Sequence, residues 1–179
     1  EEVERVLDDI RRVVEEVKRR LDEIDKKLTE ENERVKEELD RIDDRLRKLV
    51  EEVKRRLDEK VGDKEELERV KRELDERLKK HHEEIERLKR ELDEINKEHH
   101  RRIEELKKDL ERLLKELEDA QLPREELEKV VEDIKRKLEK AVRDLEKTVK
   151  ENKDRNDDIV RRVKKTVDDA EERLRRAVK

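Results

Sequence analysis

The four histidines of the chain, the side chains best suited to acid–base or metal chemistry, form two HH pairs eighteen residues apart. The pairs are His81–His82 and His99–His100, within the stretch KKHHEEIERLKRELDEINKEHHRR at 79–102. Imidazole titrates near neutral pH, so such pairs could sense pH, ligate a metal or join a hydrogen-bond network. Which of these roles applies depends on the elements that carry the pairs.

A metal site is the first alternative. Adjacent histidines point about 100° apart on a helix, and the two pairs are about 27 Å apart, so no HxxxH or HExxH chelate forms. His82 with Glu86, and His100 with Glu104, are i,i+4 pairs that could hold a zinc ion loosely at the surface. We therefore expect no dedicated metal site and no cofactor.

Other catalytic groups are scarce. Cysteine is absent, the hydroxyl nucleophiles are Thr29, Thr148 and Thr166, and a single glycine cannot form a phosphate-binding loop. We expect no catalytic residues, and the chain is predicted not to be an enzyme.

The composition restricts the fold to two kinds. Only 29% of residues are apolar while 63% are charged, which suits either a disordered polyelectrolyte or a long helical bundle with narrow apolar seams. The 54 basic and 59 acidic residues are interleaved, so no basic face for nucleic acid is expected. No apolar run reaches about 18 residues, so no membrane span is expected either.

The periodicity of the apolar residues favours the helical bundle over the disordered polyelectrolyte. In the first third of the chain, apolar residues recur every three or four positions, and the pattern repeats every eighteen residues: VVEEVKRRLDE at 13–23 returns as LVEEVKRRLDE at 49–59. Eighteen residues are five helical turns, so straight helices can keep one seam facing their neighbours. The other two thirds repeat in the same way.

One glycine and one proline divide the chain into three nearly equal parts. Gly62 is expected to end a helix in the left-handed conformation, with Asp63 and Glu66 forming a capping box for the next helix. Pro123 is expected in the first turn of the last helix. We predict an all-α fold: a straight antiparallel three-helix bundle, coiled-coil-like, forming one domain over 1–179 with helices at about 2–60, 64–119 and 123–178.

The absence of Met, Phe, Tyr, Trp and Cys, the near-exact repeats and the Glu/Lys/Arg filling resemble de novo designed helical bundles built from parametric geometry. This resemblance covers the whole chain. It implies a structural scaffold with no natural biochemical function.

Departures from the repeat mark a predicted polar network. Asparagine replaces an apolar residue in the middle copy of each helix, at Asn32, Asn96, Asn152 and Asn156. His81 and His99 take the position of Leu117 and are expected in the core, whereas His82 and His100 align with Glu118 and are expected at its boundary.

Counting from the two connections places residue n of the first helix level with about n + 119 of the third. This offset predicts an Asn32–Asn152 pair, a group of His99, Asn96 and Thr148, and a contact of His81 or His82 with Asn156. An unpaired buried amide costs about 1–3 kcal/mol, so the network should be satisfied internally and should specify packing.

Two roles remain open for the histidines. Imidazoles that must stay neutral to pack would give stability that is full above about pH 6.5 and is lost as the pH falls; alternatively, they serve only as polar members of the network. No partner is required by this interpretation. The rival interpretation is an interaction protein that self-assembles or binds a fourth helix, because the third helix carries additional apolar doublets such as Val130–Val131 and Ile159–Val160.

Overall fold

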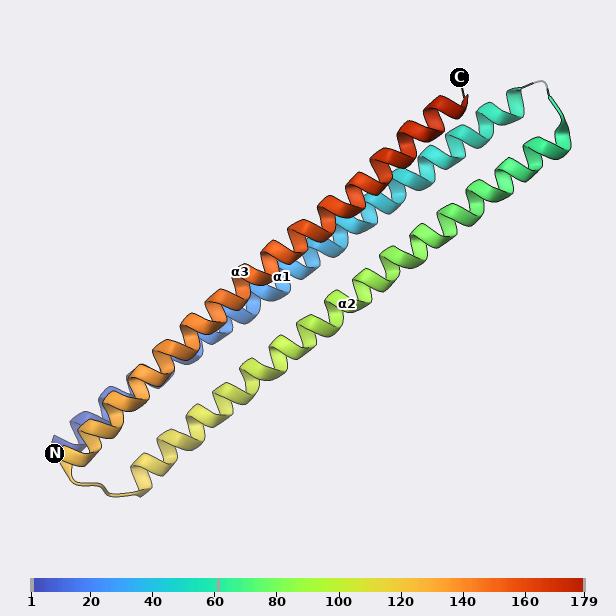
Figure 1. Ribbon diagram of the computed structural model, residues 1–179. Helices are drawn as coiled ribbons and strands as arrows, with labels where there is room; N and C mark the ends of the chain where they lie inside the picture. The colour runs from blue at the N-terminus through green and yellow to red at the C-terminus, as the bar shows by residue number, and fades with distance from the viewer. Residues whose placement is uncertain (1, 61, 179) are drawn as a thin grey trace. The chain divides into compact units, whose positions relative to one another are not determined.

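A computed structural model of the protein describes residues 2–60 and 62–178, so the predicted domain limits 1 and 179 lie outside the described residues. It contains three long helices, shown in Figure 1: α1 (Glu2–Glu59), α2 (Lys64–Asp119) and α3 (Arg124–Val178). The helices pack on one another, α1 with α2 and α1 with α3. The predicted all-α three-helix bundle is confirmed.

Contacts divide the three helices into two compact units. Unit 1 comprises Glu1–Glu31 and Ile95–Lys153, and unit 2 comprises Asn32–Glu94 and Asp154–Lys179. Each unit contains a section of every helix and has its own core. Each is described by itself below.

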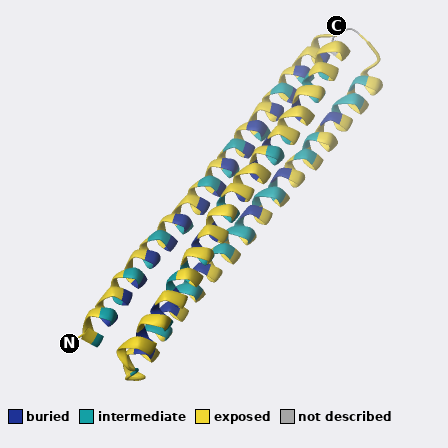
Figure 2. Ribbon diagram, turned by 60° about the vertical axis from the view of Figure 1, so that its left-hand side comes forward, coloured by how far each residue is buried: buried dark blue, intermediate teal, exposed yellow. Residues whose placement is uncertain are grey.

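The predicted apolar seams form these cores. Figure 2 shows buried residues as a stripe along each helix, with exposed residues around it. The seams face the cores because the apolar residues recur at helical spacing and so share one face of each helix. Core residues at most 2% exposed include Ile10, Leu21, Leu28, Ile103 and Leu127 in unit 1, and Val35, Leu39, Ile85, Leu92 and Val167 in unit 2.

Asp63 is the N-cap of α2, as predicted, but the end of α1 differs from the prediction. The backbone N–H of Glu65 donates to Oδ1 of Asp63 at 3.1 Å, which confirms Asp63 as the N-cap. The Glu66 carboxylate lies 3.9 Å from Arg69. The prediction for Gly62 is wrong, because it does not adopt a positive φ. Instead, Lys60 N–H donates to the carbonyl of Leu57 at 3.2 Å, which tightens the last turn of α1.

The left-handed residue lies in the second connection. Gln121 has a φ of 49°. The first residue of α3 is Arg124, one position later than predicted, because the carbonyl of Pro123 accepts the first helical hydrogen bond from Leu127 N–H at 2.9 Å. Pro123 is therefore the N-cap residue of α3.

Lysine–carboxylate pairs between α1 and α2 show their antiparallel register. In unit 2, Lys36 pairs with Asp93 and Lys89 with Asp40, each at 2.8 Å. We call such a set, with Lys and an acid four residues apart on both helices, a charge quartet. Two further quartets are Lys54, Asp58, Lys71 and Asp75 in unit 2, and Lys18, Asp22, Lys107 and Glu111 in unit 1.

The residue numbers in each of these pairs add up to 129. Counting outward from the connection between α1 and α2 predicts a sum of about 123 for residues whose backbones are level. Helical side chains lean toward the N-terminus of their own helix. In an antiparallel pair the two leans are opposite, so contacting residues have a larger sum than residues whose backbones are level.

Candidate functional site: histidine–aspartate contacts and a buried asparagine pair

The first polar feature is an asparagine pair in the core of unit 2. Nδ2 of Asn156 on α3 donates to Oδ1 of Asn32 on α1 at 2.9 Å, and the two residues are 0% and 1% exposed. The sequence-based partner of Asn156, His81 or His82, is thus replaced by Asn32. Asn152 is also buried, at 3% exposed, and its predicted pairing with Asn32 stays a prediction.

This pair shows that the predicted offset between α1 and α3 was too small. Asn32 and Asn156 differ by 124 in number, and the ion pairs Arg45–Asp168 and Glu38–Lys164 differ by 123 and 126, whereas 119 was predicted. The prediction treated each connection as a point of symmetry. The geometry of the two irregular connections could not be obtained by counting.

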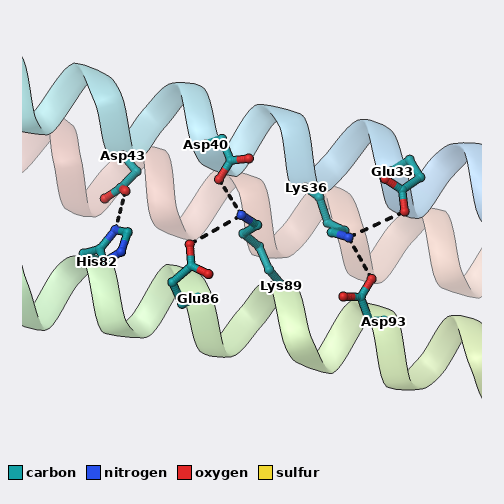
Figure 3. Close-up of polar contacts among 8 residues, drawn as sticks. All are labelled: Glu33, Lys36, Asp40, Asp43, His82, Glu86, Lys89 and Asp93. Atoms are coloured by element: carbon teal, nitrogen blue, oxygen red, sulfur yellow. Dashed lines mark hydrogen bonds and ion pairs between the residues drawn. The ribbon is translucent and has the colours of Figure 1, made fainter.

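The second feature joins His82 on α2 to Asp43 on α1, and Figure 3 shows the two side chains pointing toward each other. Nδ1 of His82 lies 2.6 Å from Oδ2 of Asp43. Because an ionised carboxylate only accepts hydrogen bonds, Nδ1 carries the proton in this contact. The hydrogen bond to Asp43 raises the pKa of His82 above its ordinary value, and the negative charge of Asp43 adds to this effect.

Exposure differs sharply between the two partners. The His82 side chain is 54% exposed, as predicted for a boundary residue, whereas the Asp43 side chain is only 16% exposed. Oδ1 of Asp43 is buried without a hydrogen-bond partner. The contact therefore places a largely desolvated carboxylate beside an imidazole that water can reach.

His81 lies at the edge of the core rather than within it. It is partly buried, and its Nδ1 atom is buried without a hydrogen bond. Burial lowers the pKa of His81, although the charges of Asp43 and Glu84 oppose this. The two neighbouring imidazoles thus have pKa values shifted in opposite directions, which was not predicted.

The same arrangement recurs in unit 1. Nδ1 of His100 lies 2.7 Å from Oδ2 of Asp25, with side chains 59% and 19% exposed, and His99 is partly buried. Three potential metal-ligand atoms, one each from Asp25, His100 and Glu104, lie within 4.8 Å of one another. Such a set could hold a divalent cation. The Lys107 ammonium, 3.5 Å from the Glu104 carboxylate, opposes cation binding there.

Sequence reasoning missed Asp25 and Asp43. They are eighteen residues apart and occupy the repeat position that Leu7, a core residue 6% exposed, holds in the first copy. The comparison of copies that identified the histidines would have identified these aspartates as well. The sequence signal for these contacts was an acidic residue at a core position, opposite a histidine on the antiparallel helix.

Thr148 and Asn96 are the remaining members of the predicted network. Oγ1 of Thr148 donates to the carbonyl of Asp144 at 3.1 Å, so its proton is used within α3 and it can join a network only as an acceptor. Asn96 is partly buried. The group of His99, Asn96 and Thr148 stays a prediction.

Comparison of the chain with protein-family models, with curated proteins and with solved structures finds no match. None of the helices, over the residues described, is long and apolar enough to span a membrane.

Proposed function

We propose that this chain is a designed structural scaffold, a non-catalytic helical bundle in which buried asparagines specify how the helices pack. The observation that carries this proposal is the hydrogen bond between Asn156 and Asn32 inside an otherwise apolar core. In the other copies the same positions hold Val14 and Val50, or Leu138 and Leu174. An amide pair in place of aliphatic contacts favours one register, because a shifted helix would leave each amide facing an aliphatic side chain.

A double-mutant cycle tests the proposal with residues taken from the other copies. Asn32→Val alone or Asn156→Leu alone should lower the free energy of unfolding by about 1–3 kcal/mol, because each removes the hydrogen bond between two buried amides and places an aliphatic side chain against the remaining one. The double variant should recover most of this stability. It should also show more than one set of amide signals, or broadened signals, in a proton–nitrogen NMR spectrum.

The two readouts separate specificity from stability. A double variant with one sharp set of signals, identical in number to those of the unmodified protein, would contradict a role of the pair in specifying packing. If the double variant lost as much stability as the two single variants together, the hydrogen bond would contribute no coupling energy.

A second proposed role, a response to pH, is supported by the histidine–aspartate contacts. The raised pKa of His82 gives stability that is present below its ordinary pKa and is lost as the pH rises through the folded-state value. The lowered pKa of His81 acts in the opposite sense, because stability is lost as the pH falls below the ordinary value. The two effects partly cancel, so the response should be weaker than two buried neutral imidazoles would give.

Thermal unfolding at about pH 7.5 and about pH 5.5 tests this role while most carboxylates stay ionised. We expect a modest shift of Tm that disappears when all four histidines are replaced by the third-copy residues, Leu at 81 and 99 and Glu at 82 and 100. A shift of the same size in that variant would exclude the histidines as its source.

A further inference from the structure

Unit 2 contains an apolar groove that its own three helices do not fill. The groove has a volume of about 910 Å³ and is lined by residues of α1, α2 and α3. The α1 contribution is entirely aliphatic, from Leu46 to Leu57, whereas every charged lining residue belongs to α2 or α3. These charged residues are exposed, so α1 forms the floor of the groove and its open side lies between α2 and α3.

Smaller side chains in unit 2 than at the equivalent positions of unit 1 account for this groove. Ala170 and Val70 line it, and the equivalent residues 36 positions away in unit 1 are Ile134 and Leu106. Ile134 is only 7% exposed, so the larger side chain fills the corresponding place in unit 1. The space in unit 2 therefore arises from side-chain choice and not from the helix repeat.

Described ion pairs join each wall of the groove to α1. Arg45 of α1 pairs with Asp168 of α3 at 2.7 Å, and Lys54 of α1 pairs with Asp75 of α2 at 2.9 Å. The described inter-helix ion pairs of this unit join α1 to α2 or α1 to α3. The facing sides of α2 and α3 are thus available to another element.

The rim of the groove carries charges without partners. Arg77 and Lys80 on α2 and Arg173 on α3, together with Glu73 and Asp169, have no ion pair within the described residues. His81, which also lines the groove, has a buried Nδ1 atom without a hydrogen bond. Three basic groups against two acidic ones favour an occupant with an excess of acid.

The dimensions suit a helix. The α1 floor from Leu46 to Leu57 spans about 16 Å, which is three helical turns. Rim charges of both signs, spaced along two parallel walls, match the flanks of an amphipathic helix rather than a single anionic head group. A second copy of the chain is a poorer fit, because it offers the same concave groove and polar outer helix faces.

We propose that this groove is a docking site for a fourth, amphipathic helix supplied by a separate chain. That helix would place aliphatic residues at i, i+3 or i+4 and i+7 over the groove, and its flanks would carry an excess of Glu or Asp facing Arg77 and Arg173. The site goes beyond the scaffold role, since asparagine-specified packing needs no partner.

A labelled synthetic peptide with the sequence of residues 36–59 and the substitutions R47E, K54E and R56E is a suitable probe. In this protein the same apolar seam packs against α2 and α3, and the substitutions give the flanks of the seam the acidic excess that the groove should favour. Fluorescence anisotropy against the full chain, up to about 100 µM, should show saturable one-to-one binding, and circular dichroism should show added helix. The control peptide carries L46S and V53S and should bind at least about tenfold more weakly, a difference of about 1.4 kcal/mol.

Two protein variants locate the binding. Ala170→Ile installs the unit 1 side chain in the groove and should weaken peptide binding at least about tenfold while leaving Tm equal or higher. Lys165→Ile adds the same side chain at an exposed position of α3 that does not line the groove, and should bind the peptide like the unmodified protein.

Three results would overturn the proposal. They are no saturable binding, equal binding of both peptides, and binding that Ala170→Ile does not weaken. A concentration-dependent mass above about 22 kDa in the absence of peptide, abolished by Ala170→Ile, would place a second copy in the groove instead. The asparagine cycle is independent of all these outcomes, so the scaffold proposal stands or fails separately.

Discussion

Nδ1 of His82 lies 2.6 Å from Oδ2 of Asp43, so the charge of an exposed imidazole on α2 is tied to a largely buried carboxylate on α1. The same relation holds between His100 and Asp25 at 2.7 Å. In both cases the carboxylate takes the place of a core leucine, and its histidine partner comes from the antiparallel neighbour. The charge state of the α1–α2 interface can therefore be followed through the protonation of individual histidines.

Asp43→Asn should lower the pKa of His82 toward its ordinary value, because the hydrogen bond to the carboxylate and its charge both raise that pKa at present. NMR titration of the His82 ring signals measures the change directly. Asp40→Asn, one helical turn away and paired with Lys89, is the matched control and should shift the His82 pKa much less. Equal shifts in the two variants would mean that general charge, and not this contact, sets the pKa.

His81→Leu should reduce the loss of stability in acid. Burial lowers the pKa of His81 in the folded state, so the unfolded chain takes up the proton more readily and stability falls as the pH drops below about 6.5. Leucine is the residue of the third copy at this position. The drop in Tm between about pH 7.5 and about pH 5.5 should therefore shrink.

His82→Gln, which removes the titrating group without placing a second carboxylate beside Asp43, provides the comparison for that experiment and should make the acid loss larger. The raised pKa of His82 contributes stability below its ordinary value, and this contribution disappears with the imidazole. If both variants changed the pH dependence in the same direction, the assignment of opposite shifts to the two neighbours would be wrong.

Reversing one charge of a quartet should be tolerated only when its partner is reversed as well. Lys36→Glu places like charges opposite each other at Asp93, and Asp93→Lys should restore the attraction. Because these side chains are partly exposed, the coupling measured by a double-mutant cycle in urea should be about 0.2–1 kcal/mol. It should fall further in about 1 M salt, where the Debye length is about 3 Å.

Gln121→Gly should raise the free energy of unfolding. Gln121 is the non-glycine residue with a left-handed φ, a conformation that costs about 1–2 kcal/mol for residues with a Cβ atom, while glycine loses about 0.5–1 kcal/mol through its freer unfolded chain. The net gain should be between about 0 and about 1.5 kcal/mol and is measured by urea titration. Ala120→Gly lacks this relief and should lower stability.

Helix number, helix limits and core seams could be predicted because one periodic pattern carries them, and a single Gly and a single Pro interrupt it. The conformations at the connections could not, because whether Gly62 or Gln121 becomes left-handed depends on how the ends of the helices meet. The pairing of Asn32 with Asn156 was missed for the same reason, since the offset between α1 and α3 depends on the geometry of both connections. Asp25 and Asp43 were predictable in principle, since they break the repeat as the histidines do.

The charge quartets have a translational symmetry that limits what they can encode. Shifting α2 by eighteen residues along α1 would bring Lys36 opposite Asp75 and Asp40 opposite Lys71, the same chemistry as in the observed pairs. The charge quartets therefore distinguish antiparallel from parallel helices, but they hardly distinguish two registers that differ by one repeat. Register must therefore be specified by residues that occur in one copy only, and the hydrogen bond between Asn32 and Asn156 does this for α1 and α3.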